Sequence, residues 1–80
     1  MQTFRLVIAS IGETLYDGDA VSVTVPGSDG ECTILAMHEP LVTTLKAGKI
    51  TARVAGGNAR TFDVHDGVLE CSGSSVTVLL

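Results

Sequence analysis

The 80-residue sequence has few aromatic and few basic residues. It contains no Trp, one Tyr and two Phe, so the side chains available for a core are mainly those of Val, Ala, Leu and Ile. Five Lys and Arg stand against nine Asp and Glu, which gives a formal net charge of −4. This balance provides no surface that could release counterions from nucleic acid, and there is no basic tail. The composition therefore argues against a nucleic-acid-binding protein.

Long apolar runs are also absent. The opening segment MQTFRLVIASI is interrupted by Arg5 and Ser10, so it fits neither a secretory signal nor a membrane span. We therefore expect a soluble, intracellular chain. Residues 1–80 should form a single domain near the lower limit at which one core holds a fold, because so short a chain buries only about 60% of its unfolded surface.

The residues that most often bind soft metals are few: Cys32, His38, His65 and Cys71. A structural zinc site would need close pairs such as C-x2-C or H-x3-H, and no such pair occurs. Each Cys lies in an apolar, strand-like run, and in a reducing compartment we expect both to be buried free thiols rather than a disulfide. The sequence therefore predicts no metal and no cofactor.

Motifs of catalytic and phosphate-binding sites are missing as well. The segment Gly27-Ser28-Asp29-Gly30 lacks the spacing and the Lys of a P-loop, and the carboxylates of Asp29 and Glu31 would repel an anion, so we interpret it as a turn. His38 and His65 could each act as a base, but no G-x-S-x-G elbow is present. A domain this small also has little room for a concave pocket. We expect a non-catalytic protein.

What the sequence does contain is alternation with a period of two. Phe4, Leu6 and Ile8 share one face of an opening strand, and the alternation is strictest at residues 21–25, where Val21, Val23 and Val25 alternate with polar residues. Further strand-like runs lie at 32–35, 41–45, 50–54, 60–65, 68–71 and 76–80. Turn residues separate these runs at Gly12, Asp17-Gly18, Pro26-Gly27, Gly56-Gly57-Asn58, Asp66-Gly67 and Ser72-Gly73-Ser74.

One run could be helical or extended. Pro40 would suit the first position of a helix and Gly48 its end, but the β-branched residues of 41–45 favour a strand. No helix of about ten residues with an apolar stripe can be drawn anywhere in the chain. Without helices, the architecture that can bury the apolar faces of these strands is two sheets packed face to face. We therefore predict an all-β fold, a small flattened β-sandwich or barrel of mainly antiparallel strands.

The segment His38-Glu39-Pro40 places polar residues between two apolar runs. A connection held by rigid strands is a common place for recognition. The residues alone leave two alternatives open, a protein interface and a plain solvated loop.

The stretch from Val25 to Gly48 resembles the central signature of the epsilon subunit of F-type ATP synthases. That signature runs V-P-G-x-x-G-x-x-G-I-L-x-x-H-x-P-L-L-x-x-L-x-x-G, and the matching positions are Val25, Pro26, Gly27, Gly30, Ile34, Leu35, His38, Pro40, Leu41, Leu45 and Gly48. The segments 14–18, 66–70 and 76–79 resemble further family motifs, so the likeness covers the whole chain. The sequence departs from the pattern at Cys32, Thr33, Val42 and Asp66.

The resemblance implies a flattened sandwich of about ten short strands and a structural rotor subunit without a cofactor. Such a subunit would link the gamma subunit to the c-ring at the cytoplasmic face of the bacterial membrane and support proton-driven ATP synthesis, with catalysis left to other subunits. Carried over by position, the loop that meets the c-ring would be Ser28, Asp29, Gly30 and Glu31. The residues on the gamma side would be Ser10, His38, Val42 and Thr43.

The sequence ends at Leu80, before the helical hairpin with which many family members inhibit ATP hydrolysis and some bind ATP. We therefore expect neither property of this chain. Two other functions stay open, a stand-alone β-sandwich binding module diverged from the epsilon subunit and a small hydrolase that uses His38 or His65.

Overall fold

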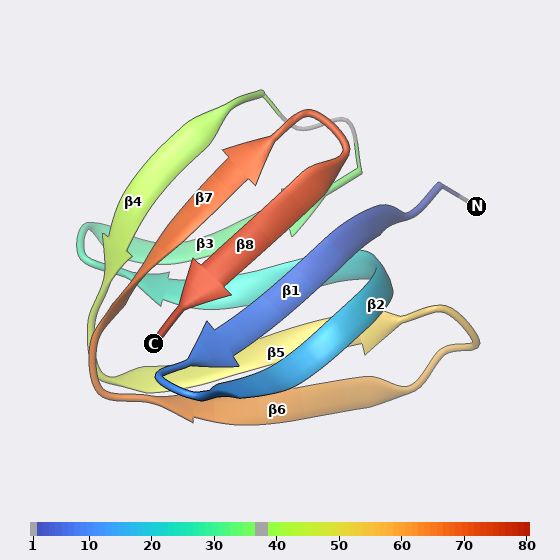
Figure 1. Cartoon of the computed structure of the whole chain (residues 1–80). Helices are drawn as coiled ribbons and strands as arrows, with labels where there is room; N and C mark the ends of the chain where they lie inside the picture. The colour runs from blue at the N-terminus through green and yellow to red at the C-terminus, as the bar shows by residue number, and fades with distance from the viewer. Residues whose placement is uncertain (1, 37–38) are drawn as a thin grey trace.

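Eight strands account for most of the computed structural model, which describes residues 2–36 and 39–80 (Figure 1). In chain order they are β1 (Phe4–Ser10), β2 (Glu13–Gly27), β3 (Gly30–Leu35), β4 (Leu41–Leu45), β5 (Gly48–Val54), β6 (Ala59–Val64), β7 (Gly67–Ser72) and β8 (Ser75–Leu79). Nowhere in these described residues is there a helix with the length and apolar character needed to span a membrane. The run at 41–45 is a strand, as its β-branched residues predict.

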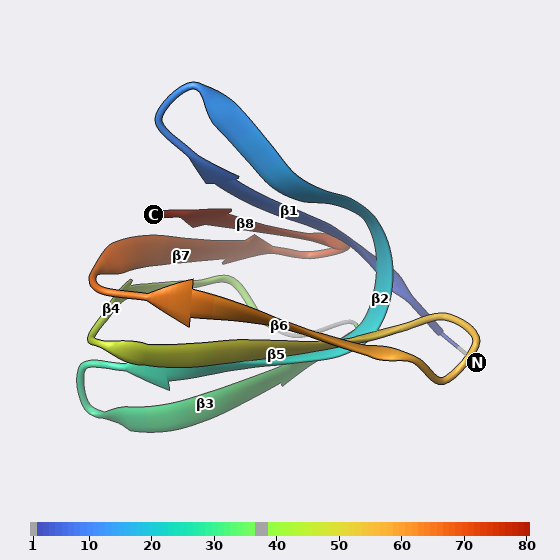
Figure 2. The same ribbon diagram turned by 90° about the horizontal axis from the view of Figure 1, so that it is seen from below.

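The strands form two facing layers, which Figure 2 shows edge-on. One layer holds β4, β7, β8 and β1 in that order, and the other holds β3, β2, β5 and β6. β1 and β8 run parallel, and every other pairing is antiparallel. The predicted all-β, flattened sandwich is therefore confirmed. The described residues make eight strands rather than about ten.

The smaller number of strands follows from the length of β2, which runs unbroken for 15 residues. We predicted a turn at Asp17-Gly18, and this prediction is wrong. Asp17 pairs with Val7 and Gly18 with Leu6 inside the β1–β2 ladder, and Gly18 has no positive φ. Hydrogen bonding to β1 therefore outweighs the local turn preference of an Asp-Gly pair.

A bulge near the middle of β2 carries the strand from one layer to the other. Ala20 lies opposite Val54 and Ser22 opposite Arg53, so Val21 is the extra residue in the pairing of β2 with β5. The bulge also changes the predicted inward face. Ala20 is fully buried with Val23, whereas Val21 is only half-buried.

The core between the layers is aliphatic. Its buried members are Phe4, Leu6, Ile8, Ala20, Val23, Val25, Ile34, Leu45, Ile50, Ala52, Val64, Leu69, Cys71, Val76 and Val78. No polar or charged side chain of the described residues is buried with them. The inward face predicted for the opening strand agrees with this core, since Phe4, Leu6 and Ile8 are all buried, and Phe62 and Leu80 pack at the margin of the core.

One edge of the sandwich is open, because no pairing joins β6 to the amino-terminal half of β2 in the described chain. Aromatic side chains cover this open edge instead. The rings of Tyr16 and Phe62 lie 6.4 Å apart between centroids, and the Arg60 guanidinium lies 5.3 Å from the centre of the Tyr16 ring. Tyr16 is further fixed by a 2.8 Å hydrogen bond that its hydroxyl donates to the carbonyl oxygen of Asp19.

Candidate functional site

The hairpin between β2 and β3 ends in a tight turn. Gly27 pairs with Gly30, which leaves only Ser28 and Asp29 between the strands. Gly30 has a φ of 131°, and a Cβ on Gly27 would lie 2.8 Å from the carbonyl oxygen of Gly30. The turn therefore requires glycine at both positions. The predicted loop 28–31 is shorter in the structure, because Gly30 and Glu31 already belong to β3.

The tip of this hairpin is acidic and solvent-exposed. Asp29 and Glu31 are both exposed. Among residues 2–36 and 39–80, the ion pairs join Arg5 to Asp17 and Lys49 to Asp63, and neither Asp29 nor Glu31 takes part in one. Their two carboxylates are therefore available to a partner that brings basic or amide groups.

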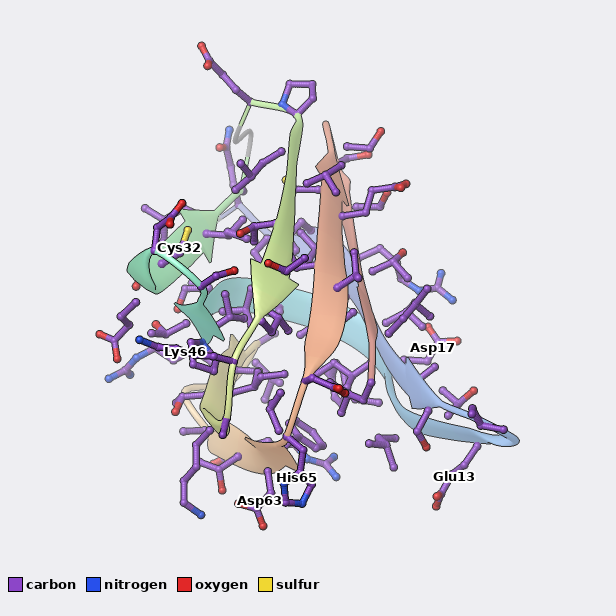
Figure 3. The ribbon with its side chains drawn as sticks, turned by 90° about the vertical axis from the view of Figure 1, so that its left-hand side faces the viewer. Glu13, Asp17, Cys32, Lys46, Asp63 and His65 are labelled. Atoms are coloured by element: carbon purple, nitrogen blue, oxygen red, sulfur yellow. The ribbon has the colours of Figure 1, made fainter. Side chains whose placement is uncertain are left out.

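A shallow depression of about 260 Å³ lies beside the tip. It is lined by Gly27, Asp29, Gly30, Glu31, Cys32, Leu41 and Thr43. Figure 3 shows Cys32 and Lys46 on this same side of the domain. The tip is held against β4 here, where Gly27 pairs with Leu45 and the Lys46 N–H donates to the carbonyl oxygen of Pro26 at 2.9 Å.

The outer surface of the layer β4–β7–β8–β1 carries exposed apolar side chains. Thr44, Val68, Leu79 and Ala9 lie directly opposite one another on the four neighbouring strands. Val68 is 40% exposed and Leu79 57%. Val42 is 67% exposed and lies in the adjoining row, with Glu70, Thr77 and Val7. We call Ala9, Val42, Thr44, Val68 and Leu79 the apolar face.

The apolar face has the properties of a docking surface. Monomeric proteins rarely expose contiguous apolar patches larger than about a few hundred Å², and larger patches with a polar margin mark interaction sites. Beyond Ala9, the β1–β2 turn adds Ile11, which is 99% exposed. The arrangement thus offers a rigid, flat sheet surface for a protein partner.

The structure separates the residues predicted for the gamma side. Val42 lies on the apolar face, but Thr43 points to the opposite side of β4, because neighbouring residues of a strand alternate, and it lines the depression. Ser10 is half-buried at the end of β1, next in sequence to Ala9. His38 lies outside the described residues.

Sequence analysis did not identify Val68, Leu79 or Ala9 as site residues. The period-two alternation identified the residues of each strand that face the core. The apolar residues that face outward on the same strands were given no role. The signal was present in the final strand, where Leu79 follows the buried Val78. Only the order of the strands, however, shows that these residues are neighbours.

The described residues provide no metal centre. No group of three or more His, Cys, Asp or Glu in the described ranges could hold an ion. Figure 3 shows His65 far from Cys32, near Asp63 at another end of the domain. A hydrogen bond from Lys49 lowers the pKa of the Asp63 carboxyl, which fits a surface ion pair.

The two cysteines are free thiols with different surroundings. Cys71 is buried in the core, and burial raises the pKa of its thiol, with a smaller contribution from Cys32. Cys32 is half-buried and lines the depression. The expected free thiols are confirmed, although Cys32 is not fully buried.

We therefore predict selective alkylation. Cys32 should react with N-ethylmaleimide at least about tenfold faster than Cys71, because reaction of Cys71 requires opening of the core and a thiolate that its raised pKa disfavours. Mass spectrometry of peptides after timed quenching measures both rates, and the protein in urea, where the two rates should converge, serves as the control. Equal rates in the native protein would show that the core around Cys71 is open.

Comparison with known proteins connects these surfaces to a family. Residues 3–80 match the family model described as "ATP synthase, Delta/Epsilon chain, beta-sandwich domain". Among similar curated proteins, the ATP synthase epsilon chains of Psychrobacter sp. and Xanthomonas campestris are 39% and 38% identical to it over 79 and 80 residues. That of Delftia acidovorans is 35% identical over 79 residues. The matches cover 99–100% of this chain but 57% of each relative.

Solved structures share the fold at lower sequence identity. A chain of the Euglena gracilis mitochondrial ATP synthase, in a structure of OSCP, F1 and c-ring, superposes with a TM-score of 0.91 at 20% identity over 96% of this chain and 49% of that one. A chain of the Tetrahymena thermophila mitochondrial ATP synthase central stalk and c-ring gives a TM-score of 0.79 at 10% identity, over 98% and 63%. At these identities the likeness concerns the fold.

Proposed function

The chain belongs to the ATP synthase delta/epsilon family, and from this we propose that it is a non-catalytic, structural subunit of the central stalk of an F1Fo ATP synthase. In this role it links the gamma subunit to the c-ring and supports proton-driven ATP synthesis. The observation that carries the proposal is the apolar face, whose exposed side chains lie across four paired strands of the domain.

The gamma subunit docks on the apolar face in this proposal. The face spans four hydrogen-bonded strands, so it is rigid and broad, as an interface that must persist under torque requires. Val42 contacts gamma directly, and Ser10 does so from the end of β1 beside Ile11. The predicted gamma contacts of Thr43, which points to the other side of β4, and of His38, which lies outside the described residues, stay predictions.

The c-ring contacts the acidic hairpin tip, formed by Ser28, Asp29, Gly30 and Glu31. Its two exposed carboxylates fix the register of the contact more than its strength, because exposed charge pairs contribute little affinity. The carboxylates lie on the β2–β3 hairpin, whereas the apolar face lies on β4, β7, β8 and β1, which supports a subunit that touches two partners at once.

The location follows from the same role. A subunit bound to gamma and the c-ring belongs to the F1 sector, at the cytoplasmic face of the bacterial membrane, and associates with the membrane only through its partners. The similar solved structures are a mitochondrial ATP synthase OSCP, F1 and c-ring assembly and a central stalk with c-ring, which supports this placement.

Co-elution tests the proposed function. Purified protein is mixed with purified gamma subunit, with detergent-solubilised c-ring, and with both, and each mixture is resolved by size exclusion. We expect a stable complex with gamma and a ternary complex that contains all three. Elution of the protein as a free monomer from every mixture would overturn the proposal.

A further inference from the structure

The side chain of Ser28 is hydrogen-bonded within the domain. Its Oγ donates to the carbonyl oxygen of Thr44 at 2.8 Å, and its backbone N–H donates to the same oxygen at 3.0 Å. The single hydroxyl hydrogen of Ser28 is used in the first bond, so the Oγ1–H of Thr44 donates to the Oγ of Ser28, with which it is in direct contact. We call these three bonds the Ser28–Thr44 clamp.

The clamp attaches the hairpin tip to the layer that bears the apolar face. Ladder pairing between β2 and β4 is limited to Gly27 and Leu45. β4 is in turn paired with β7 along its whole length, from Leu41 to Leu45. Thr44 belongs to the apolar face and is bonded to Ser28 of the tip, so this residue connects the two surfaces. Figure 1 shows the end of β4 beside the β2–β3 turn.

We propose that Ser28 and Thr44 are positioning residues that hold the acidic carboxylates of the hairpin tip at a fixed place relative to the apolar face. The partner-binding part of this proposal rests on the c-ring contact of the proposed function. A turn of two residues attached by few bonds opens easily. If the turn is already held in one conformation, less conformational entropy is lost when a partner binds. Ser28 belongs to the tip, and in this proposal its side-chain bonds to Thr44 hold Asp29 and Glu31 in place.

Amide hydrogen exchange tests the clamp in the free protein. Ser28→Ala removes the hydroxyl at position 28, and Thr44→Val removes the hydroxyl at position 44. Thr44→Ser keeps a hydroxyl at position 44. Thr24→Val is a matched control, because it breaks a comparable 2.9 Å hydroxyl pair with Thr33 on the other layer. The amide of Lys46, which donates to Pro26, should exchange about fivefold faster in Ser28→Ala and Thr44→Val and at the wild-type rate in Thr44→Ser and Thr24→Val. Unchanged exchange in the first two variants, or an equal acceleration of β1 amides, would overturn the clamp.

Binding to the purified c-ring tests the positioning role. Ser28→Ala and Thr44→Val should weaken binding about three- to tenfold, Thr44→Ser should restore it, and the affinity of Ser28→Ala for gamma should stay at the wild-type value. Equal ring affinity of wild type and Ser28→Ala would overturn the positioning role and leave the proposed function intact. If wild-type protein itself does not bind the ring, the proposed ring contact is wrong, whereas the exchange experiment still decides the clamp.

Discussion

Val68→Glu should weaken binding to the gamma subunit at least about 100-fold while the domain stays folded. Val68 lies at the centre of the apolar face, between Thr44 on β4 and Leu79 on β8. It is 40% exposed in the free domain, where a carboxylate can reach water. Under a partner the same carboxylate would be buried without a counter-charge, beside Glu70, and such burial is costly. Calorimetric titration with gamma measures the loss.

Two control variants separate this effect from general damage to the sheet. Val68→Thr keeps the β-branched shape and should bind gamma within about tenfold of wild type. Thr51→Glu adds the same charge to the outer surface of the other layer, where Thr51 pairs with Thr24 and Thr61, and should leave the affinity for gamma unchanged. Wild-type affinity of Val68→Glu, or an equal loss in Thr51→Glu, would show that gamma does not dock on the apolar face.

Leu69→Ala should lower the free energy of unfolding by about 2–5 kcal/mol. Leu69 follows Val68 but points inward, is fully buried, and lies opposite Thr43 and Val78. Domains of ordinary stability unfold at a cost of about 5–15 kcal/mol, and a chain this short belongs to the lower end. Urea denaturation followed by circular dichroism should therefore show a much lower midpoint or a partly unfolded protein at zero denaturant.

The matched variant for this position is Leu69→Met, which nearly conserves volume and should cost less than about 1.5 kcal/mol. A loss below about 1 kcal/mol for Leu69→Ala would mean that β7 does not pack into the core as described. Together the neighbours Val68 and Leu69 separate two properties: the first substitution removes binding and spares stability, and the second lowers stability.

Most of the fold could be predicted because period-two alternation and the lack of any amphipathic helix leave few other architectures. The failures lie where distant pairing overrides local preference. Asp17-Gly18 has the composition of a turn, but its pairing with β1 keeps it extended. Val21 fits the alternation of its strand, but the bulge opposite β5 replaces it in the core with Ala20.

The candidate site was predictable in part. The glycines around Ser28 and Asp29 mark a hairpin tip in any sequence, because tight turns need them. The apolar face was not predictable from alternation, since it depends on β1 lying parallel to β8 and on β4 pairing with β7. Val42 and Thr43 are neighbours in sequence, and the resemblance assigned both to the gamma side. Because side chains alternate along a strand, the two residues point to opposite sides of β4.

Photo-crosslinking in a reconstituted rotor tests the central claim most directly, that one small domain joins gamma to the c-ring through two separate surfaces. A photoreactive amino acid is placed at Val42 on the apolar face, at Asp29 on the hairpin tip, or at Thr51 on the outer surface of the other layer. The prediction is that position 42 crosslinks to gamma, position 29 to the c subunit and position 51 to neither. Crosslinking of positions 42 and 51 to gamma with equal yield, or no product with the c subunit from position 29, would contradict it.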